Sequence, residues 1–391
     1  MKIALTTKDV PKENPDASFT TVVNLAKELK KRKNDVTIIT NRGFSDTKTH
    51  KRNEKEEVRE NVRIFRPYYL PWFNLHFFKK YILLDPTSIF NRFFAAPLGV
   101  RKMDKKESFS IVHSFGGANL MVLQGLIAKL FSKRARLVHT IKSRSFFKLF
   151  GKFKFTFLLN KADKLTVPNR LFKKELINAG CRKELIEVVH SPVDLTKFKS
   201  GKNAALRKKL NLPNKKIVMY YGHLVETKGW RTLLESIELI KDDIFFLFVV
   251  PPEQNPDAVK FLKSYKKIRL IADKVNVADY VNASDVVVLP YWNMKNTIAN
   301  PLCLLESMAC KTPVITTDVP EFRDLFESEK EVLMVKPKDP KSLAENIVKL
   351  LNNKKLQKRL VENSSKKVKE FDAGKIADQY INIYNEVLSG S

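Results

Sequence analysis

Short apolar runs alternate with stretches of helical periodicity along the whole chain. Residues 2–6 (KIALT) and 36–40 (VTIIT) predict two buried strands, and apolar residues recur at helical spacing between Phe19 and Leu29. A strand, a helix and a second strand form the unit that makes a right-handed parallel crossover. The same rhythm then predicts strands at 110–113, 136–141, 164–168 and 186–190, with helices at 118–131 and 169–179.

The alternation starts again after Asp194 and continues to the end of the chain. It predicts six further strands, at 216–222, 244–250, 267–272, 285–290, 313–318 and 331–337. Helices are predicted between and after them, at 230–240, 301–310, 340–352, 354–370 and 373–388.

Two series of alternating strands and helices predict an α/β fold with two doubly wound, Rossmann-like domains. We place these domains at 1–192 and 193–371, and expect a helix within 372–391 to cross back to the first domain. Ligands of open parallel sheets bind beyond the carboxyl ends of the strands. We therefore expect a ligand cleft where the two domains face each other.

The composition is that of a globular protein without a disulfide or zinc framework. The 391 residues are 43% hydrophobic, enough to repay the entropy lost on folding. Cys181, Cys303 and Cys310 are too few for a disulfide framework, and no Cys/His cluster has zinc-site spacing. The opening MKIALTTKDV lacks the apolar core of a signal peptide, and the longest apolar run, 244–250, is too short to cross a bilayer. We expect a non-spanning protein of a reducing compartment.

The net charge of +30 is unevenly distributed. Residues 1–200 carry +23 and residues 201–391 carry +7, and within 101–160 basic residues outnumber acidic ones by 13 to 2. Such an asymmetric field predicts an anionic partner: a membrane surface, a nucleic acid or an acidic substrate. The simpler alternative is that many surface lysines only keep the protein soluble.

Six stretches of the chain, in order, share the pattern of one known family. They are MKIAL with LAKELKKRKNDVTIIT, FSIVHSFGG, ADKLTVPNRLFKKELINAGCRKELIEVVHSPVDLTKF, MYYGHLVETKGWRTLLESI, ASDVVVLPYW and PLCLLESMACKTPVITTDVPEFRDL. In order and spacing they resemble the retaining glycosyltransferases of family 4. One such fragment is weak evidence, but six in order are specific. The resemblance covers nearly the whole chain and implies the GT-B fold of two Rossmann-like domains, with a nucleotide diphosphate sugar as donor substrate.

The resemblance implies three residues that act on the leaving diphosphate. Lys228, in the T-K-G that follows the strand at 216–222, matches the family's phosphate lysine. His223 occupies the position of a family arginine, and Lys142 that of a histidine after a first-domain strand. Basic side chains and a helix N-terminus can stabilise this charge, so the resemblance implies no metal and no cofactor. The alternative for Lys228 is a solvated lysine at the start of a helix.

The donor nucleotide is expected at the end of the second domain's strands. By resemblance, Glu306 accepts hydrogen bonds from the ribose hydroxyls, a task that suits a carboxylate because it only accepts. Asn300, Leu302 and Cys303 would present backbone N–H groups to the phosphates, next to the strand that ends at Gly222. The alternative for Glu306 is a surface glutamate that stabilises a helix N-terminus.

Two further positions depart from the family pattern. Ile298 stands where the family has a second glutamate, and Asp16-Ala17 stand where it has a Gly-Gly loop that approaches the donor phosphate. These departures keep a second hypothesis open, in which the chain is a catalytically silent GT-B scaffold that binds nucleotide or membrane and acts through interactions.

Two segments of the first half, 67–84 and 145–161, interleave aromatic and basic residues. In the second segment, six apolar residues approximate one face of a helix: Phe146, Phe147, Leu149, Phe150, Phe153 and Phe157. This pattern is typical of an amphipathic helix on an anionic membrane surface, although the same residues could instead cover the first domain's sheet. Nucleic acid ranks below membrane, because no recognition helix, RNA-binding sheet or zinc-finger signature accompanies the pattern.

The resemblance and the charge together predict an enzyme at the membrane. We expect a retaining, metal-independent transferase that moves a hexose-type sugar to a lipid-linked glycan, a glycolipid or a polysaccharide precursor. It would lie in the cytoplasm, peripherally on the inner face of the cell membrane. In such sites the leaving phosphate can itself take the acceptor's proton, so we assign no protein base.

Overall fold

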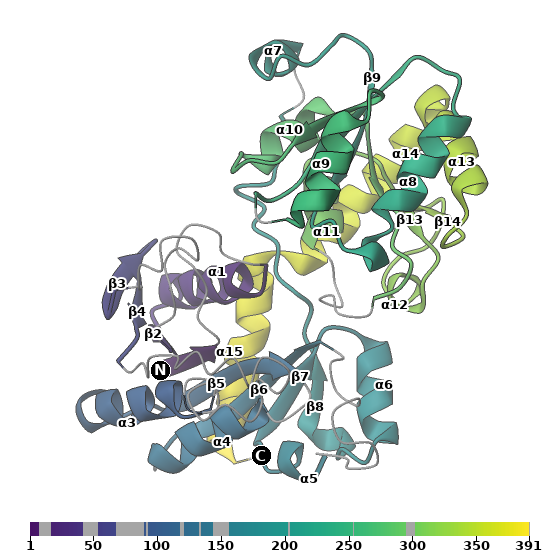
Figure 1. Cartoon of the computed structure of the whole chain (residues 1–391). Helices are drawn as coiled ribbons and strands as arrows, with labels where there is room; N and C mark the ends of the chain where they lie inside the picture. The colour runs from purple at the N-terminus through teal and green to yellow at the C-terminus, as the bar shows by residue number, and fades with distance from the viewer. Residues whose placement is uncertain are drawn as a thin grey trace, which may run out of the picture. The chain divides into compact units, whose positions relative to one another are not determined.

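The computed structural model divides the chain into two compact units (Figure 1). The first comprises Met1–Pro192 and Ala373–Ser391, and the second comprises Val193–Asp372. Both are α/β units built around a largely parallel sheet, which confirms the predicted fold class. The structure describes residues 1–7, 17–41, 54–67, 90, 93–117, 121–132, 134–143, 156–201, 204–252, 254–294 and 302–390.

The sheet of the first unit has eight strands in the order β3-β4-β2-β1-β5-β6-β7-β8. Neighbours pair in parallel except β3 and β4, which form an antiparallel hairpin. The strands are β1 (Lys2–Thr7), β2 (Asp35–Thr40), β3 (Glu56–Arg59), β4 (Val62–Phe65), β5 (Ile111–Gly117), β6 (Arg136–Ser143), β7 (Lys164–Val167) and β8 (Ile186–Val188).

The hairpin of β3 and β4 was not predicted from the sequence. Its two turn residues, Glu60 and Asn61, have φ of 50° and 63°. Two-residue hairpin turns need positive φ because their twist then matches that of the strands, and glycine usually supplies it. Here a glutamate precedes the asparagine, so the usual sequence signal is missing.

Helices cover both faces of this sheet. They are α1 (Ala17–Lys31), α3 (Ala95–Glu107), α4 (Val122–Phe131), α5 (Thr156–Leu159), α6 (Arg170–Asn178) and α15 (Ala373–Ser389), with a 3-10 turn at Lys183–Leu185. In Figure 1, α1 and α15 lie on one side of the sheet and α3 and α4 on the other. Alternate strand residues face the two layers, so Ile3, Leu5 and Ile38 share one buried core with α1 and α15.

A buried polar network attaches the C-terminal helix α15 to the first sheet. Nδ1 of His113 lies 2.6 Å from the Tyr384 hydroxyl, and Nε2 lies 2.6 Å from Oγ1 of Thr140. That Thr140 hydroxyl also lies 3.0 Å from the hydroxyl of Tyr380. All four residues are buried, and hydrogen bonds satisfy their polar atoms within the protein.

The sheet of the second unit has six parallel strands in the order β11-β10-β9-β12-β13-β14. They are β9 (Lys216–Tyr221), β10 (Ile244–Val249), β11 (Ile268–Ile271), β12 (Val286–Leu289), β13 (Val314–Thr317) and β14 (Leu333–Val335). One buried cluster lies on each face of this sheet. The sheet is therefore covered by helices on both sides, as parallel sheets require.

The helices of the second unit begin with α7 (Ala204–Lys209) and end with the 3-10 turn η4 (Val368–Phe371) that precedes α15. Between them lie the 3-10 turn η3 (Glu226–Lys228), α8 (Trp230–Leu239), α9 (Pro256–Ser264), α10 (Val277–Ala283), α11 (Leu302–Ala309), α12 (Pro320–Arg323), α13 (Pro340–Asn352) and α14 (Lys354–Lys367). In the second unit, the sequence analysis predicted α8, α11, α13 and α14 but not α7, α9, α10 and α12.

The strand order of the second sheet reverses between β9 and β12. The chain moves outward through β10 and β11 on one side, then returns and continues through β13 and β14 on the other. At such a reversal the connections after the two central strands diverge to opposite faces and leave a crevice. The segments that follow β9 and β12 therefore mark the expected ligand position in this unit.

Candidate functional site

The segment that follows β9 brings Lys228 back over the end of its own strand. Gly222 has φ of +133°, a backbone conformation that residues other than glycine rarely adopt. A Cβ atom on Gly222 would lie 3.3 Å from the Lys228 ammonium nitrogen and 3.9 Å from the sulfur of Cys303. Gly222, Lys228 and Cys303 are therefore neighbours, and the glycine leaves backbone exposed beside a positive charge.

The turn that carries Lys228 is fixed against the end of β12. Gly229 has φ of +71°, and a Cβ atom there would lie 1.7 Å from the carbonyl oxygen of Pro290. The N–H of Trp292 donates to the Thr227 carbonyl at 2.8 Å. The T-K-G sequence therefore has a structural reason: only glycine allows the two central segments of the sheet to meet here.

The lysine itself has no carboxylate partner in the part of the chain that the structure describes. Its side chain is half-buried, and its ammonium lies 6.0 Å from the centre of the Tyr291 ring. A partly buried cation that no carboxylate neutralises can stabilise a bound anion. This is the property expected of a residue that contacts a diphosphate.

Tyr221, the last residue of β9, holds the first turn of α11. Its hydroxyl donates to the Cys303 carbonyl at 2.5 Å and lies 3.3 Å from Oε2 of Glu306. Ser307 is also within 3.3 Å of this hydroxyl and donates to the same Cys303 carbonyl at 2.7 Å. The tyrosine thus connects the end of β9 to the carboxylate that the resemblance assigns to the ribose.

The Glu306 carboxyl group is poised to change its charge near neutral pH. Burial raises its pKa to about 7, although the charge of Lys197 and the hydrogen bond from Tyr221 act in the opposite direction. Burial also raises the pKa of the Cys303 thiol to about 12, so this cysteine is a neutral thiol at physiological pH. A ligand that donates hydrogen bonds to Glu306 would favour its ionised form.

His223 follows Gly222 and has a defined tautomer. The side-chain oxygen of Gln254 accepts a hydrogen bond from the Leu224 N–H at 2.7 Å, so its amide nitrogen faces Nδ1 of His223 at 3.1 Å. Nδ1 of His223 must then accept the hydrogen bond from the Gln254 amide, which places the proton of the neutral imidazole on Nε2 of His223. His223 can therefore offer a hydrogen bond to an anion even when uncharged.

The structure brings together four of the predicted site residues: Gly222, Lys228, Cys303 and Glu306. Leu302 begins α11 beside them. Asn300 lies outside the described residues, as do Ile298 and Asp16.

Lys142 belongs to the first unit, where it is the penultimate residue of β6, with its ammonium 4.6 Å from the centre of the Phe115 ring. It lies at the carboxyl edge of that sheet, near the small void lined by Thr21, Pro168 and His190. Its catalytic role stays a prediction.

Tyr221, Ser307, Gln254 and Lys197 lie around the site but were not singled out from the sequence. In the sequence, Tyr221 looks like one more apolar residue of the strand that contains MYYG. Ser307 looks like an ordinary residue of a buried helix. Their hydroxyl groups meet because the end of β9 lies against the first turns of α11. Lys197 carried a weak signal, since it stands in the VDLTKF stretch of the resemblance.

Neither a metal centre nor a membrane span is found in the described ranges. No group of three His, Cys, Asp or Glu side chains there has the arrangement to hold a metal ion. No helix of these ranges is long and apolar enough to cross a bilayer. Metal independence stays a prediction.

Two family models match the chain, one on each unit. The model described as Glycosyltransferase Family 4 matches residues 19–197, and the one described as Glycosyl transferases group 1 matches residues 202–367. Together they cover most of the sequence.

Curated relatives include enzymes with lipid-linked and lipid acceptors in their names. The chain is 26% identical to N,N'-diacetylbacillosaminyl-diphospho-undecaprenol alpha-1,3-N-acetylgalactosaminyltransferase of Campylobacter jejuni, over 54% of this chain and 57% of that protein. It is 27% identical to the processive diacylglycerol alpha-glucosyltransferase of Acholeplasma laidlawii, over 73% of this chain and 87% of that protein. The chain spans about half the length of three of the curated relatives it matches.

Solved structures share the fold. The Anabaena protein HepE in complex with UDP-glucose superimposes with a TM-score of 0.74 over 100% of both chains, at 17% sequence identity. At this identity the likeness concerns the fold alone. Family matches on both units, named relatives and shared architecture agree: the chain belongs to the family-4-like glycosyltransferases with the GT-B fold.

Proposed function

We propose that this protein is a retaining glycosyltransferase that moves a hexose-type sugar from a nucleotide diphosphate sugar. The acceptor would be a lipid-linked glycan, a glycolipid or a polysaccharide precursor at a membrane. Support for these acceptors comes from the undecaprenol diphosphate and diacylglycerol in the names of two relatives. Support for the donor comes from the UDP-glucose in a structure of the same fold.

One arrangement carries the proposal: a cation next to Gly222 and a carboxyl group next to Tyr221, at the reversal of a parallel sheet. Lys228 and Cys303 flank Gly222, and Tyr221 ties Cys303 to Glu306. A nucleotide diphosphate presents two groups that differ in chemistry, a vicinal diol and a pyrophosphate. An acceptor-only group for the diol and a cation for the pyrophosphate match those two demands.

In this proposal the chain's own residues stabilise the leaving group. As the sugar leaves, negative charge grows on the diphosphate, and Lys228 and the Nε2–H of His223 would stabilise it more strongly than in the ground state. Glu306 would hold the ribose and so orient the sugar. The leaving phosphate would take the proton of the acceptor hydroxyl on the face where the new bond forms, which accounts for retention without a protein base.

A donor screen tests the proposal. The full-length protein is incubated with UDP-, GDP- and ADP-sugars, with and without a membrane lipid extract, while binding and turnover are measured. We expect one nucleotide class to bind and its sugar to be transferred to a lipid fraction. Nucleotide binding without hydrolysis or transfer would instead support a catalytically silent scaffold, and failure of every donor to bind would contradict both hypotheses.

Substitution of Glu306 separates a ligand role from a structural one. We expect Glu306→Ala to lower nucleotide affinity at least tenfold, because hydrogen bonds to a charged group contribute about 1.5–3 kcal/mol each. The melting temperature should change little. Glu345, an exposed glutamate of α13, provides the control: Glu345→Ala should leave both quantities unchanged. A large fall in melting temperature for Glu306→Ala would identify the residue as structural.

We propose that the first unit binds an anionic membrane through its basic, aromatic part. Most of the predicted amphipathic face lies outside the described residues, but Phe157 on α5 is 58% exposed. Leu130 on the neighbouring helix α4 is 77% exposed. Exposed aromatic and aliphatic side chains next to excess positive charge suit the boundary between headgroups and acyl chains.

Vesicle binding tests the membrane proposal. We expect the protein to sediment with anionic vesicles but not with neutral ones, and added salt should weaken this binding. Phe157→Ser should reduce it. Phe261→Ser, at a 44% exposed phenylalanine of the second unit, should not. Equal binding to neutral and anionic vesicles would contradict the proposal.

A further inference from the structure

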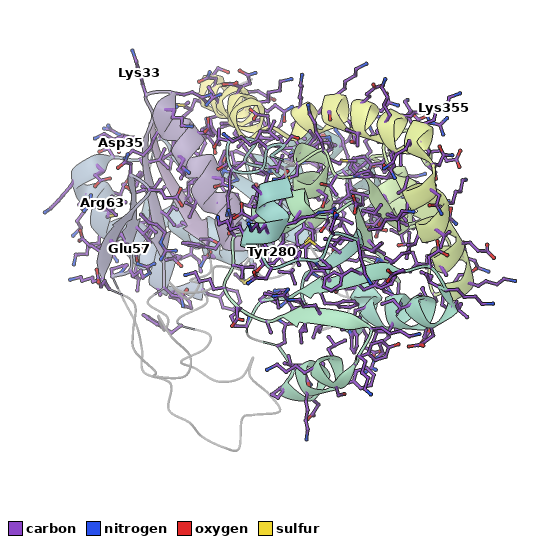
Figure 2. All side chains as sticks on the ribbon, turned by 90° about the horizontal axis from the view of Figure 1, so that it is seen from above. Lys33, Asp35, Glu57, Arg63, Tyr280 and Lys355 are labelled. Carbon is purple, nitrogen blue, oxygen red and sulfur yellow. The ribbon has the colours of Figure 1, made fainter. Side chains whose placement is uncertain are left out.

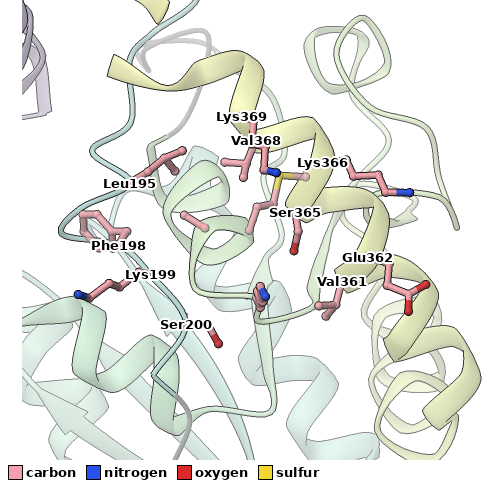
Figure 3. A pocket seen from close by; sticks show the side chains of 13 residues that line it. Leu195, Phe198, Lys199, Ser200, Val361, Glu362, Ser365, Lys366, Val368 and Lys369 are labelled. Carbon is pink, nitrogen blue, oxygen red and sulfur yellow. The ribbon is translucent and has the colours of Figure 1, made fainter. Parts of the chain in front are cut away.

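A groove of about 630 Å³ lies within the second unit and takes no part in the site at the sheet reversal (Figure 3). The segment 195–200 forms one wall, the end of α11 together with Lys311 forms the base, and α14 with η4 forms the other wall. This volume is within the range of pockets that bind small organic molecules.

The groove combines an apolar interior with a positively charged lining. Its apolar side chains come from all three segments: Leu195, Phe198, Met308, Val361 and Val368. Four lysines also line it: Lys199, Lys311, Lys366 and Lys369. None of these lysines pairs with a carboxylate among the residues that the structure describes. Glu362 is the sole carboxylate among the lining residues, and Lys358 already lies 3.9 Å from it.

A polar atom in the groove has no hydrogen-bond partner. Oγ of Ser365 is buried, and no donor or acceptor of the described chain reaches it. In Figure 3 this side chain extends from α14 toward the hollow. Burying a hydroxyl without a partner costs free energy, so a ligand atom that can hydrogen-bond here would gain from it.

Lys311 stands in a backbone conformation that favours glycine. Its φ is 57°, at the end of α11, where the N–H of Thr312 bonds to the Ser307 carbonyl at 3.0 Å and that of Lys311 to Met308 at 3.0 Å. This pair of bonds is the helix ending at which glycine is strongly preferred. A lysine at this position accepts strain and adds a positive charge to the groove, which invites a functional explanation.

The wall opposite α14 is held in place. The side chain of Asn282 accepts a hydrogen bond from the N–H of Gly201 at 2.8 Å and donates to the Lys199 carbonyl at 3.0 Å. The same nitrogen donates to the Ala278 carbonyl at 2.9 Å. The segment is thus attached to α10, so the groove is preformed and a ligand need not order it.

From these observations we propose that the groove binds an amphiphilic organic phosphate. A phosphate monoester carries a charge between −1.5 and −2 at neutral pH, which suits several lysines better than the single charge of a carboxylate. Lysine binds phosphate as a point charge. The phosphate would lie near Lys311 and Ser365, and its hydrocarbon part against Phe198 and Val361. The proposal is independent of the donor site.

Calorimetry with octyl phosphate on the full-length protein tests this proposal. Inorganic phosphate supplies the charge without the chain, and octyl glucoside supplies the chain without the charge. We expect octyl phosphate to bind at least tenfold more tightly than either. Equal affinity for octyl phosphate and inorganic phosphate, or for octyl phosphate and octyl glucoside, would overturn the proposal. So would an absence of binding.

Lys311→Gly is the decisive variant because it removes the positive charge and also relieves the backbone strain of the positive φ at this position. We expect affinity for octyl phosphate to fall about tenfold, as for loss of one charged hydrogen bond, while the melting temperature does not fall. Lys33→Gly is the matched control. Lys33 lies two residues after the end of α1, has φ of 60° and extends into solvent (Figure 2). Its replacement removes the same charge and should leave affinity unchanged. An equal loss of octyl phosphate affinity in both variants would mean that the ligand is attracted only by the protein's net charge, which would overturn the proposal.

A vesicle arm distinguishes a soluble phosphate from a membrane lipid. Vesicles with phosphatidic acid present the same phosphate at a bilayer surface. If Lys311→Gly weakens binding to these vesicles as much as to octyl phosphate, the groove takes its ligand from the membrane. If only octyl phosphate binding weakens, the ligand is a soluble phosphate. Both results support a phosphate site in the groove. If Lys311→Gly weakens neither vesicle binding nor octyl phosphate binding, the proposed site is contradicted.

Discussion

The hydroxyl of Tyr221 donates a hydrogen bond of 2.5 Å to the carbonyl oxygen of Cys303, 82 residues later in the chain. The bond joins the carboxyl end of β9 to the first turn of α11. Because the same hydroxyl lies 3.3 Å from Glu306, one tyrosine contacts both the backbone and the carboxylate of α11 at the carboxyl edge of the second sheet. We therefore regard Tyr221 as a positioning residue rather than a catalytic one.

Tyr221→Phe should weaken nucleotide binding by roughly tenfold, because the carboxylate loses the group that orients it and one hydrogen bond that favours its ionised form. The midpoint of the pH dependence of binding should also move to higher pH. Tyr220→Phe is the control, since the buried Tyr220 hydroxyl donates to the His223 carbonyl at 2.9 Å instead. If the role of Tyr221 is purely structural, both variants should be less stable, and the midpoint of the pH dependence of nucleotide binding should not move.

The affinity for UDP-glucose should rise with pH up to about 7 and then level off. The pKa of Glu306 is raised to about 7 by burial, so the carboxyl is largely protonated in the empty site below that pH. Ribose hydroxyls favour the carboxylate, so binding must release a proton there and weakens as the pH falls. UDP-glucose is the suitable probe because its pyrophosphate diester does not titrate in this range.

Glu306→Gln should remove this dependence, since an amide does not titrate. Histidine gains charge over the same pH range and acts on an anion with the opposite sign, so the measurement is the difference between the parent protein and the variant. We expect that difference to approach zero near pH 5 and to be largest at pH 8. A difference independent of pH would show that Glu306 does not titrate in the site.

His223→Arg should strengthen diphosphate binding. Arginine is always charged and can donate two parallel hydrogen bonds to a phosphate, whereas the neutral imidazole donates one from Nε2. We expect a several-fold gain in UDP affinity at pH 8, measured by calorimetry. His223→Asn, which keeps polarity without charge, should not reproduce the gain. Equal affinity of the arginine variant and the parent would place His223 outside the phosphate site.

The first unit should lose stability in acid before the second. Burial lowers the pKa of His139 to about 4, and burial together with the charges of His139 and Lys142 lowers that of His113 well below its ordinary value. The unfolded chain therefore binds protons more readily below pH 6.5, and stability falls between pH 6.5 and about 4. For His139 alone the loss reaches about 3 kcal/mol.

Hydrogen exchange of amides in β5 and β6 measures this loss, with β9 and β12 of the second unit as an internal reference. His139→Gln should lower protection at pH 7.5, because Ser114 loses its 2.7 Å contact with Nδ1, but should flatten the dependence on pH. Equal acid sensitivity of both units would contradict the assignment of the effect to the buried histidines.

Much of the fold follows from local pattern. The apolar runs at 2–6, 36–40 and 216–222 are strands, because burial on both faces of a parallel sheet leaves continuous apolar sequences. The hairpin at 56–65 escaped prediction because positive φ at Glu60 and Asn61 is not announced by glycine. Its pairing is decided by contacts with β2.

Some residues of the candidate site could be predicted from the sequence, and others could be identified only from tertiary contacts. The T-K-G sequence, the LLESMA helix and the strand ending at Gly222 are visible as motifs, because a resemblance preserves residue types at fixed spacing. Tyr221 and Lys197 were missed because their significance lies in neighbours far along the chain, and no periodicity records such a neighbour.

The sequence by itself determined most of the strands and the longer helices, the presence of two α/β units and the family to which they belong. Local propensity and apolar periodicity act over a few residues, and these features are local. Only the tertiary structure decided which residues share one environment: Tyr221 with Glu306, Gly229 against Pro290, and Lys311 with Ser365 in the lining of one groove. Such contacts depend on the order of strands in a sheet, and that order is set by the packing of the whole unit.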